Sequence, residues 1–229
     1  MLKSKSLRTF YILISSMVLG IVCCLLFLAF GPTLMGFVLV VMLCMMTGAV
    51  VSTIATRNSE HGMTDTLTGL WNRGGFDLYL SEEYNRQKRL DKPQPMSLLI
   101  LDLDGFKSYN DTFGHPAGDQ VLKAVSGVLL NCANRPADKV FRHGGDEFSV
   151  LLPDTDLSGC FHIAEEIRNS VKELNMECDH DGNVITVSIG GVTVDASESV
   201  PLTKVIEEAD DNLYKSKNNG RDKVNAGSM

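Results

Sequence analysis

The sequence lacks any cysteine pattern that would indicate a disulfide framework or a zinc site. Its six cysteines stand at positions 23, 24, 44, 132, 160 and 178. Three of them fall in apolar N-terminal stretches, and no two close pairs have the spacing that zinc ligands use. We therefore expect free thiols in a reducing compartment.

Acidic residues are absent from the first 57 positions, which carry a formal charge of +4 from Lys3, Lys5, Arg8 and Arg57. Because the whole chain carries −7, residues 58–229 carry −11. An acidic domain is a poor candidate for non-specific nucleic-acid binding, so no nucleic-acid partner is expected. One nucleotide bound through metal ions remains compatible with this charge.

Charged residues are also missing from two apolar runs, 9–30 and 34–55. Each run would be about 33 Å long as a helix, enough to cross the hydrocarbon core of a membrane. Gly31-Pro32-Thr33 between them indicates a turn. Because the basic residues flank the pair, the positive-inside rule places both termini in the cytoplasm. The sequence therefore predicts a multi-pass protein of the bacterial inner membrane, with its larger domain cytoplasmic.

Two other interpretations of these runs are open. A cleaved signal peptide fits poorly, because no A-x-A site follows and a second apolar run comes at once. The runs could also form a buried helical hairpin in a soluble protein. We favour a membrane anchor over residues 1–56, a polar linker over 57–64 and one domain over 65–229. The linker and the short outer turn leave no room for a separate sensor domain.

Hydrophobic periodicity beyond the linker predicts alternating helices and strands. Strands are expected at 96–101, 139–141, 148–152, 184–194 and 221–225. Helices are expected at 76–90, around 121–128, from near 156 to 174, and from 202 to a C-cap at Gly220. Residues 110–119 are rich in polar and turn-forming residues and are expected to form a loop.

The segment Arg142-His143-Gly144-Gly145-Asp146-Glu147-Phe148 lies between two of these strands. A Gly-Gly pair between β-type runs indicates a hairpin, and polar residues at its tip need have no further role. The alternative is chemical. Glycines allow another backbone or a ligand to approach closely, and carboxylates beside them suit Mg²⁺ next to a phosphate.

This segment matches the GGDEF signature, and the chain resembles the diguanylate cyclases. Five further segments match in the expected order: D-T-L-T-G-L-W-N-R, D-L-D-G-F-K-S-Y-N-D, F-G-H-P-A-G-D, T-V-S-I-G-G and A-D-D-N-L-Y-K-S-K-N-N-G-R. The resemblance implies an α/β (α+β) fold related to the palm of polymerases and to nucleotidyl cyclases. In it, helices flank a central, mainly antiparallel five-stranded sheet.

The resemblance also implies an activity, namely condensation of two GTP into cyclic di-GMP with release of two pyrophosphates. Each 3′-hydroxyl attacks the α-phosphate of the other GTP, so a homodimer is expected to hold the nucleotides face to face. Two Mg²⁺ ions per active site, with Mn²⁺ as an alternative, would activate the hydroxyl and neutralise the phosphates. A catalytically inactive receptor for cyclic di-GMP and a membrane-anchored dimerisation module are the alternatives.

Residue roles follow from matching positions in the family. Metal ligation is implied for Asp102, the Leu103 carbonyl, Asp146 and Glu147, and Asp146 also stands at the position of the proposed general base. Guanine recognition is implied for Asn110 and Asp119, and close approach of the nucleotide for Gly144 and Gly145. Phosphate binding is implied for the cations Lys107, Lys217 and Arg221.

A product-binding inhibitory site is implied by Arg135 and Asp138, which have the family's R-x-x-D spacing before Gly144. An arginine fork suits phosphate and guanine acceptors. In some relatives a following helix supplies a second arginine to this site. Here Glu166 stands at that position, so we expect product inhibition that is present but weak.

Overall fold

The computed structural model describes residues 62–178, 182–195 and 200–229, together with six isolated positions between 36 and 46. The chain divides into two compact units, Met1–Glu60 and His61–Met229. The six isolated positions are all helical. Apart from them, the predicted spans over 9–30 and 34–55 lie outside the described residues. Within the part that is described, no helix combines the length and the apolar character needed to cross a bilayer.

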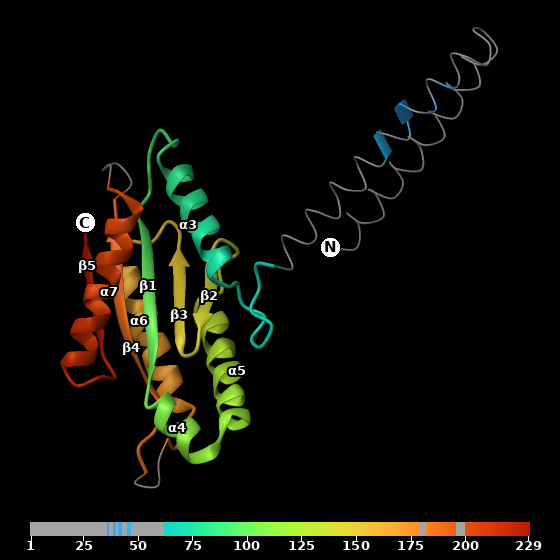
Figure 1. Ribbon diagram of the computed structural model, residues 1–229. Helices are drawn as coiled ribbons and strands as arrows, with labels where there is room; N and C mark the ends of the chain where they lie inside the picture. Colours follow the sequence, from blue (N-terminus) through green and yellow to red (C-terminus); the bar gives the residue numbers. More distant parts are fainter. Residues whose placement is uncertain are drawn as a thin grey trace. The chain divides into compact units, whose positions relative to one another are not determined.

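The second unit is built on a five-stranded sheet with the order β2-β3-β1-β4-β5 (Figure 1). The strands are β1 (Met96–Asp104), β2 (Lys139–Gly144), β3 (Glu147–Leu152), β4 (Thr186–Val194) and β5 (Val224–Ser228). The first three neighbouring pairs are antiparallel and β4–β5 is parallel, which confirms the predicted, mainly antiparallel sheet. Parallel neighbours need a crossover, and the helix α7 (Leu202–Asn218) provides it.

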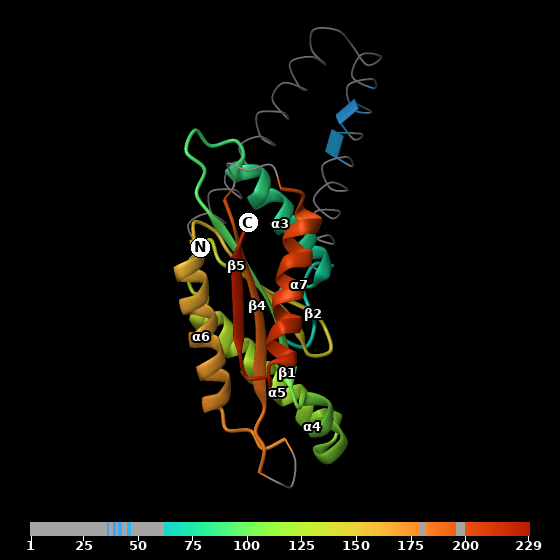
Figure 2. The same cartoon turned by 90° about the vertical axis from the view of Figure 1, so that its left-hand side faces the viewer.

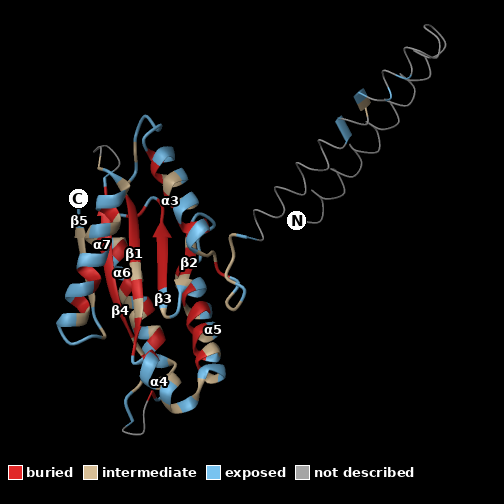
Figure 3. Ribbon diagram, viewed as in Figure 1, coloured by how far each residue is buried: buried red, intermediate tan, exposed pale blue. Residues whose placement is uncertain are grey.

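Helices cover both faces of the sheet (Figures 1 and 2). One face packs against α3 (Arg73–Gln87) and α7, and the other against α5 (His115–Cys132) and α6 (Leu157–Glu173). Figure 3 shows the resulting burial of the central strands. Along β1, Leu99 and Leu101 join the core beneath α5 and α6, whereas Leu98 joins the core beneath α3. Because side chains alternate along a strand, Asp102 and Asp104 belong to the face that α7 covers.

Capping residues determine where the helices begin. The Asn72 side chain accepts a hydrogen bond from the Gly75 amide, so α3 begins at Arg73 rather than at the predicted Phe76. Asp156 caps α6 in the same way through the Gly159 amide, as predicted. The last helix ends at Asn218, and Gly220 follows with φ of 105°, which confirms the predicted glycine stop.

One predicted element is wrong and another is shifted along the chain. Residues 110–119 are not a loop, because α4 (Phe106–Phe113) and α5 occupy them with only Gly114 between, at φ of 83°. Pro116 fits the first turn of α5. The polar side chains of residues 110–119 belong to solvent-exposed helical turns, so no apolar periodicity marks these turns in the sequence. The closing strand begins at Val224 rather than Arg221, because Arg221 and Asp222 both have positive φ.

Candidate active site

The hairpin between β2 and β3 turns at Gly144-Gly145-Asp146, as predicted. Gly144 has φ of 139° and Gly145 has φ of 55°, a region that L-residues rarely adopt. A Cβ on either glycine would meet no atom within 4 Å. Both glycines are therefore required by the backbone conformation, and the space above them is open to another molecule.

Arg142 holds this turn from below. Its Nε and Nη2 atoms donate to the Gly145 carbonyl at 3.1 and 2.8 Å, and its Nη1 lies 2.9 Å from Asp65 Oδ1. Asp65 also accepts hydrogen bonds from the Thr68 amide and hydroxyl, at 2.9 and 2.6 Å. The segment that precedes α3 thus braces the hairpin. Sequence reasoning assigned no role to Arg142 or Asp65, although both lie in the matched segments.

The acidic residues meet at one edge of the sheet. Asp102 of β1 pairs in register with Glu147 of β3, and the Leu103 amide donates to the Asp146 carbonyl at 3.4 Å. On the other side of Asp102, Lys217 of α7 forms an ion pair with it at 2.8 Å. A cavity of about 220 Å³ opens here. Among the residues that line it are Arg73, Asp77, Asp102, His143, Glu147, Asp210 and Lys217.

The electrostatics of this edge favour a bound cation. Burial raises the pKa of Asp102, the nearby charges of Asp146 and Asp104 raise it further, and Lys217 opposes the shift. Burial and the Glu147 charge likewise raise the pKa of Asp210. Across the described residues, no three His, Cys, Asp or Glu side chains already converge on one metal position. The donors present, carboxylates and a backbone carbonyl, nevertheless suit a hard divalent cation.

Asn110 lies on α4 beside the start of α5. Its Oδ1 atom is buried and has no hydrogen-bond partner among the residues that the structure describes. A Cβ at Gly118 would lie 1.9 Å from that oxygen, so the missing side chain of Gly118 is what makes room for it. Asp119 is the next residue along α5, so the predicted guanine-reading pair comes from adjoining segments. Buried carbonyl oxygens seldom lack a donor, so this oxygen has unused capacity to accept a hydrogen bond.

The remaining predicted cations lie around the same edge. Lys107 is exposed on the first turn of α4. Arg221 follows α7, and its Nε lies 3.7 Å from Asp104 Oδ1. Asp104 itself was not predicted as a site residue, yet it is 7% exposed and accepts hydrogen bonds from Thr186 and Ser188. The alternation Asp102-Leu103-Asp104 was the available signal, because it puts both carboxylates on one face.

Arg135 and Asp138 lie at the other end of the sheet. Lys139, next to them, pairs with Leu151, whereas Glu147 pairs with Asp102. Leu151 lies four positions along β3 from Glu147, which corresponds to about 14 Å. Arg135 Nη2 lies 2.8 Å from Asp138 Oδ1. The two predicted sites are thus spatially distinct.

A cavity of about 450 Å³ lies beside Arg135. Its lining includes Thr155, whose hydroxyl accepts a hydrogen bond from Arg135 Nη2 at 2.6 Å, and His162 of α6. Glu166 is exposed one turn further along α6, where its charge adds to the burial that raises the pKa of Cys132. Sequence reasoning missed His162. Its spacing of four residues from Glu166 would have indicated that both side chains lie on the same face of the helix.

Known proteins match both the sequence and the fold. Diguanylate cyclase A of Treponema denticola is 38% identical over 180 residues, covering 77% of this chain and 48% of that protein. A protein of Staphylococcus epidermidis named as an uncharacterized membrane protein is 36% identical over 172 residues, covering 75% of this chain and 48% of that protein. The chain thus spans about half the length of these relatives.

Among solved structures, the coiled coil and GGDEF domain of DgcB from Caulobacter crescentus, in complex with c-di-GMP, has a TM-score of 0.69 and 33% identity. The match covers 82% of this chain and 99% of that one. The family model described as "Diguanylate cyclase, GGDEF domain" matches residues 62–223, nearly all of the unit that carries the site. With the hairpin, the acidic edge and this fold in place, the chain belongs to the GGDEF-domain family of diguanylate cyclases.

Proposed function

We propose that this chain is a diguanylate cyclase that joins two GTP molecules into cyclic di-GMP and releases two pyrophosphates. The observation that carries the proposal is the buried Asn110 Oδ1, which accepts no hydrogen bond from the described residues and lies beside the segment that carries Asp119. Guanine offers the donors that such acceptors need, an N1–H and a 2-amino group, and adenine does not offer that pattern. The acidic edge at Asp102 and Glu147 supplies the complementary place for phosphates with their metal ions.

Each side chain has a defined task in this reaction. Asn110 and Asp119 orient the base, and the open backbone at Gly144 and Gly145 lets the nucleotide lie against the hairpin. Lys107, Lys217 and Arg221 oppose the negative charge that grows on the phosphates in the transition state. Asp146 stands at the end of the hairpin, where it can accept the proton of the attacking 3′-hydroxyl.

The Asp102, Asp146 and Glu147 carboxylates, with the Leu103 carbonyl, would hold Mg²⁺ or Mn²⁺. Such an ion lowers the pKa of the attacking hydroxyl and neutralises phosphate charge. Lys217 pairs with one oxygen of Asp102, so this cation lies beside the carboxylate that would hold the ion. Two subunits, each with one GTP, complete the in-line geometry, which makes the homodimer the active form.

Purified full-length chain incubated with GTP and Mg²⁺ tests this function. We expect cyclic di-GMP and pyrophosphate in a ratio of one to two, and loss of both in Asp146→Asn. A mixture of GTP and ATP should still give mainly cyclic di-GMP, because Asp119 is present to read guanine. Absence of product from a dimeric preparation, or a mainly hybrid dinucleotide, would contradict the proposal.

The N-terminal unit is proposed to anchor the enzyme in the bacterial inner membrane with the cyclase domain in the cytoplasm. Support comes from the two uncharged runs, the flanking basic residues and the relative named as a membrane protein. Reporters fused after Met229 test the topology. A cytoplasmic reporter should be active and a periplasmic one silent, and the reverse pattern would refute the orientation.

Product feedback is proposed at Arg135 and Asp138. The adjoining cavity of about 450 Å³ and its distance from the acidic edge support a site separate from catalysis. Arg135→Ala should raise the product level reached at long times and leave the initial rate nearly unchanged. Glu166→Arg should lower that level, because a cation replaces a charge that repels the product phosphates, although exposure of Glu166 moderates the effect. A progress curve unchanged by Arg135→Ala would remove this role.

A further inference from the structure

The turn that carries Arg221 has an unusual backbone. Arg221 has φ of 57° and Asp222 has φ of 46°, two consecutive left-handed residues without a glycine. Such conformations are sparsely populated and persist only where the surrounding structure holds them. Some contact outside the turn must therefore hold it.

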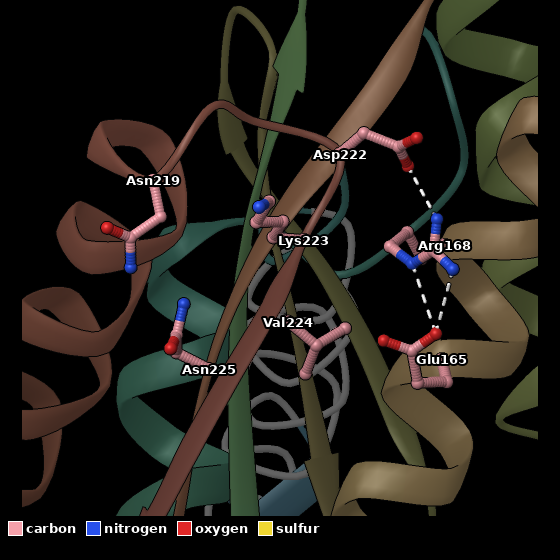
Figure 4. Close-up of a pocket in the computed structure, with 7 residues that line it drawn as sticks. All are labelled: Glu165, Arg168, Asn219, Asp222, Lys223, Val224 and Asn225. Atoms are coloured by element: carbon pink, nitrogen blue, oxygen red, sulfur yellow. Dashed lines mark hydrogen bonds and ion pairs between the residues drawn. The ribbon is translucent and has the colours of Figure 1, made fainter.

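Asp222 is held from both faces of the sheet. Its backbone N–H donates to Asp104 Oδ2 at 3.1 Å, on the face of α7. Its carboxylate accepts hydrogen bonds from Arg168 Nη1 at 2.7 Å and Lys172 Nζ at 2.5 Å, both on α6. Figure 4 shows the Asp222 side chain directed toward Arg168. Burial alone would raise the pKa of Asp222, but the hydrogen bonds from Lys172 and Arg168 bring it below its ordinary value.

Each of these anchors is itself fixed. Asp104 is 7% exposed and receives the Ser188 hydroxyl at 2.8 Å. Arg168 is also bound by Glu165, whose Oε2 lies 2.9 Å from Nη2. A cavity of about 600 Å³ opens beside this group, and three of the charged residues that line it, Glu165, Arg168 and Asp222, are paired with one another (Figure 4). The ion pairs of Arg168 with Glu165 and Asp222 therefore hold the turn in place.

We infer that Asp222, clamped between Asp104 and Arg168, is a positioning residue that sets the place of Arg221 at the triphosphate. The inference rests on the proposed function, in which Arg221 binds phosphate. The Arg221 guanidinium lies against the same carboxylate that binds the Asp222 amide, with Nε 3.7 Å from Asp104 Oδ1. Loss of the contacts to Asp222 makes the turn flexible. Arg221 then loses more conformational entropy each time GTP binds, which weakens binding.

A double-mutant cycle on the full-length chain tests this. Arg168→Met should raise the KM for GTP roughly three- to tenfold, with a smaller change in kcat, as for loss of about one charged contact. In an Arg221→Ala background the same substitution should add almost nothing, because the residue it positions is gone. Asp222→Asn, which tolerates the left-handed backbone, should give a smaller rise in the same direction and replaces Arg168→Met if that variant does not fold.

The matched control is Arg86→Met. Arg86 of α3 also donates to an aspartate with positive φ, Asp154, but at the opposite end of the sheet. The initial rates of the Arg86→Met variant should match those of the parent chain. Equal effects of Arg168→Met with and without Arg221, or an unchanged KM, would overturn the inference while leaving the cyclase intact.

The same double-mutant cycle can be measured without turnover, as GTP affinity by calorimetry with Ca²⁺ in place of Mg²⁺. Weaker binding in Arg168→Met that vanishes in the Arg221→Ala background supports the inference even if catalysis is absent. A parent chain that neither binds nor converts GTP would refute the proposed function and this inference together.

Discussion

Lys217 Nζ lies 2.8 Å from Asp102 Oδ2, which joins the last turn of α7 to the end of β1. The two residues are more than one hundred positions apart, and α7 brings them together as the crossover between β4 and β5. This pair links the phosphate-binding side of the proposed site to its metal-binding side. It also identifies a carboxylate whose ionisation the fold disfavours.

Asp102→Asn should lower kcat by at least roughly 100-fold, because a carboxylate ligand of the metal ion is lost. In metal-free buffer at pH 7 its melting temperature should equal or exceed that of the parent chain. The reason is that burial, together with Asp146 and Asp104, outweighs Lys217 and raises the pKa of Asp102. A carboxyl group whose pKa is raised by folding stabilises the folded state at pH values below its pKa in the unfolded chain. That stabilisation is lost as the pH rises through its pKa in the folded state. A clearly lower melting temperature would contradict this.

Gly118→Ala should raise the KM for GTP roughly tenfold, because its Cβ would displace the Asn110 carbonyl 1.9 Å away and leave guanine donors unpaired. Gly127→Ala is the matched control on the same helix, where a Cβ meets no atom within 4 Å. It should stabilise the helix by up to about 1 kcal/mol without changing kinetics. Steady-state rates and thermal melts of both variants decide the matter. Equal kinetics for the two would show that Asn110 is not positioned by Gly118.

Gly190→Ala should destabilise the domain by about 3 kcal/mol or more. A Cβ there would lie 2.1 Å from the Leu213 amide nitrogen and 2.2 Å from the Ala209 carbonyl, so α7 would have to move off the sheet. Gly227→Ala provides the comparison, since its Cβ would make an ordinary 3.6 Å contact with Asn212. Denaturant unfolding should separate the two clearly, and similar midpoints would show that α7 yields at little cost.

Asp65→Asn should weaken the brace of the hairpin by about 2 kcal/mol at neutral pH, because Asp65 accepts charged and neutral hydrogen bonds there. Burial tends to raise the pKa of Asp65, but hydrogen bonds from Thr68 and Arg142 leave it below its ordinary value of 3.8. A carboxyl group whose pKa is lowered by folding stabilises the folded state at pH values above its pKa in the unfolded chain. That stabilisation is lost as the pH falls through its pKa in the folded state. The difference in melting temperature should therefore shrink below about pH 4. A difference that persisted there would indicate a packing effect instead.

The sequence by itself determined the order of most elements and the chemistry of the site. Apolar runs marked the central strands, Asp156 marked the start of α6, and Gly220 marked the end of α7. These signals are local, because capping, turn conformation and periodicity depend on neighbouring residues. The ordered motifs, ending with Arg221, were local as well and sufficed to indicate the family.

Only the tertiary structure decided which of these residues meet. Lys217 and Asp102 pair because α7 crosses the sheet, and the Asn110 oxygen, which has no partner in the described part of the chain, fits because Gly118 of another helix leaves space for it. Asp222 carried no sequence signal of its own, and the alternation that places Asp104 beside Asp102 did not show its partners, since these hydrogen bonds link β1, β4 and α6. Contacts between distant segments depend on how strands order and helices pack, and no local pattern encodes that geometry.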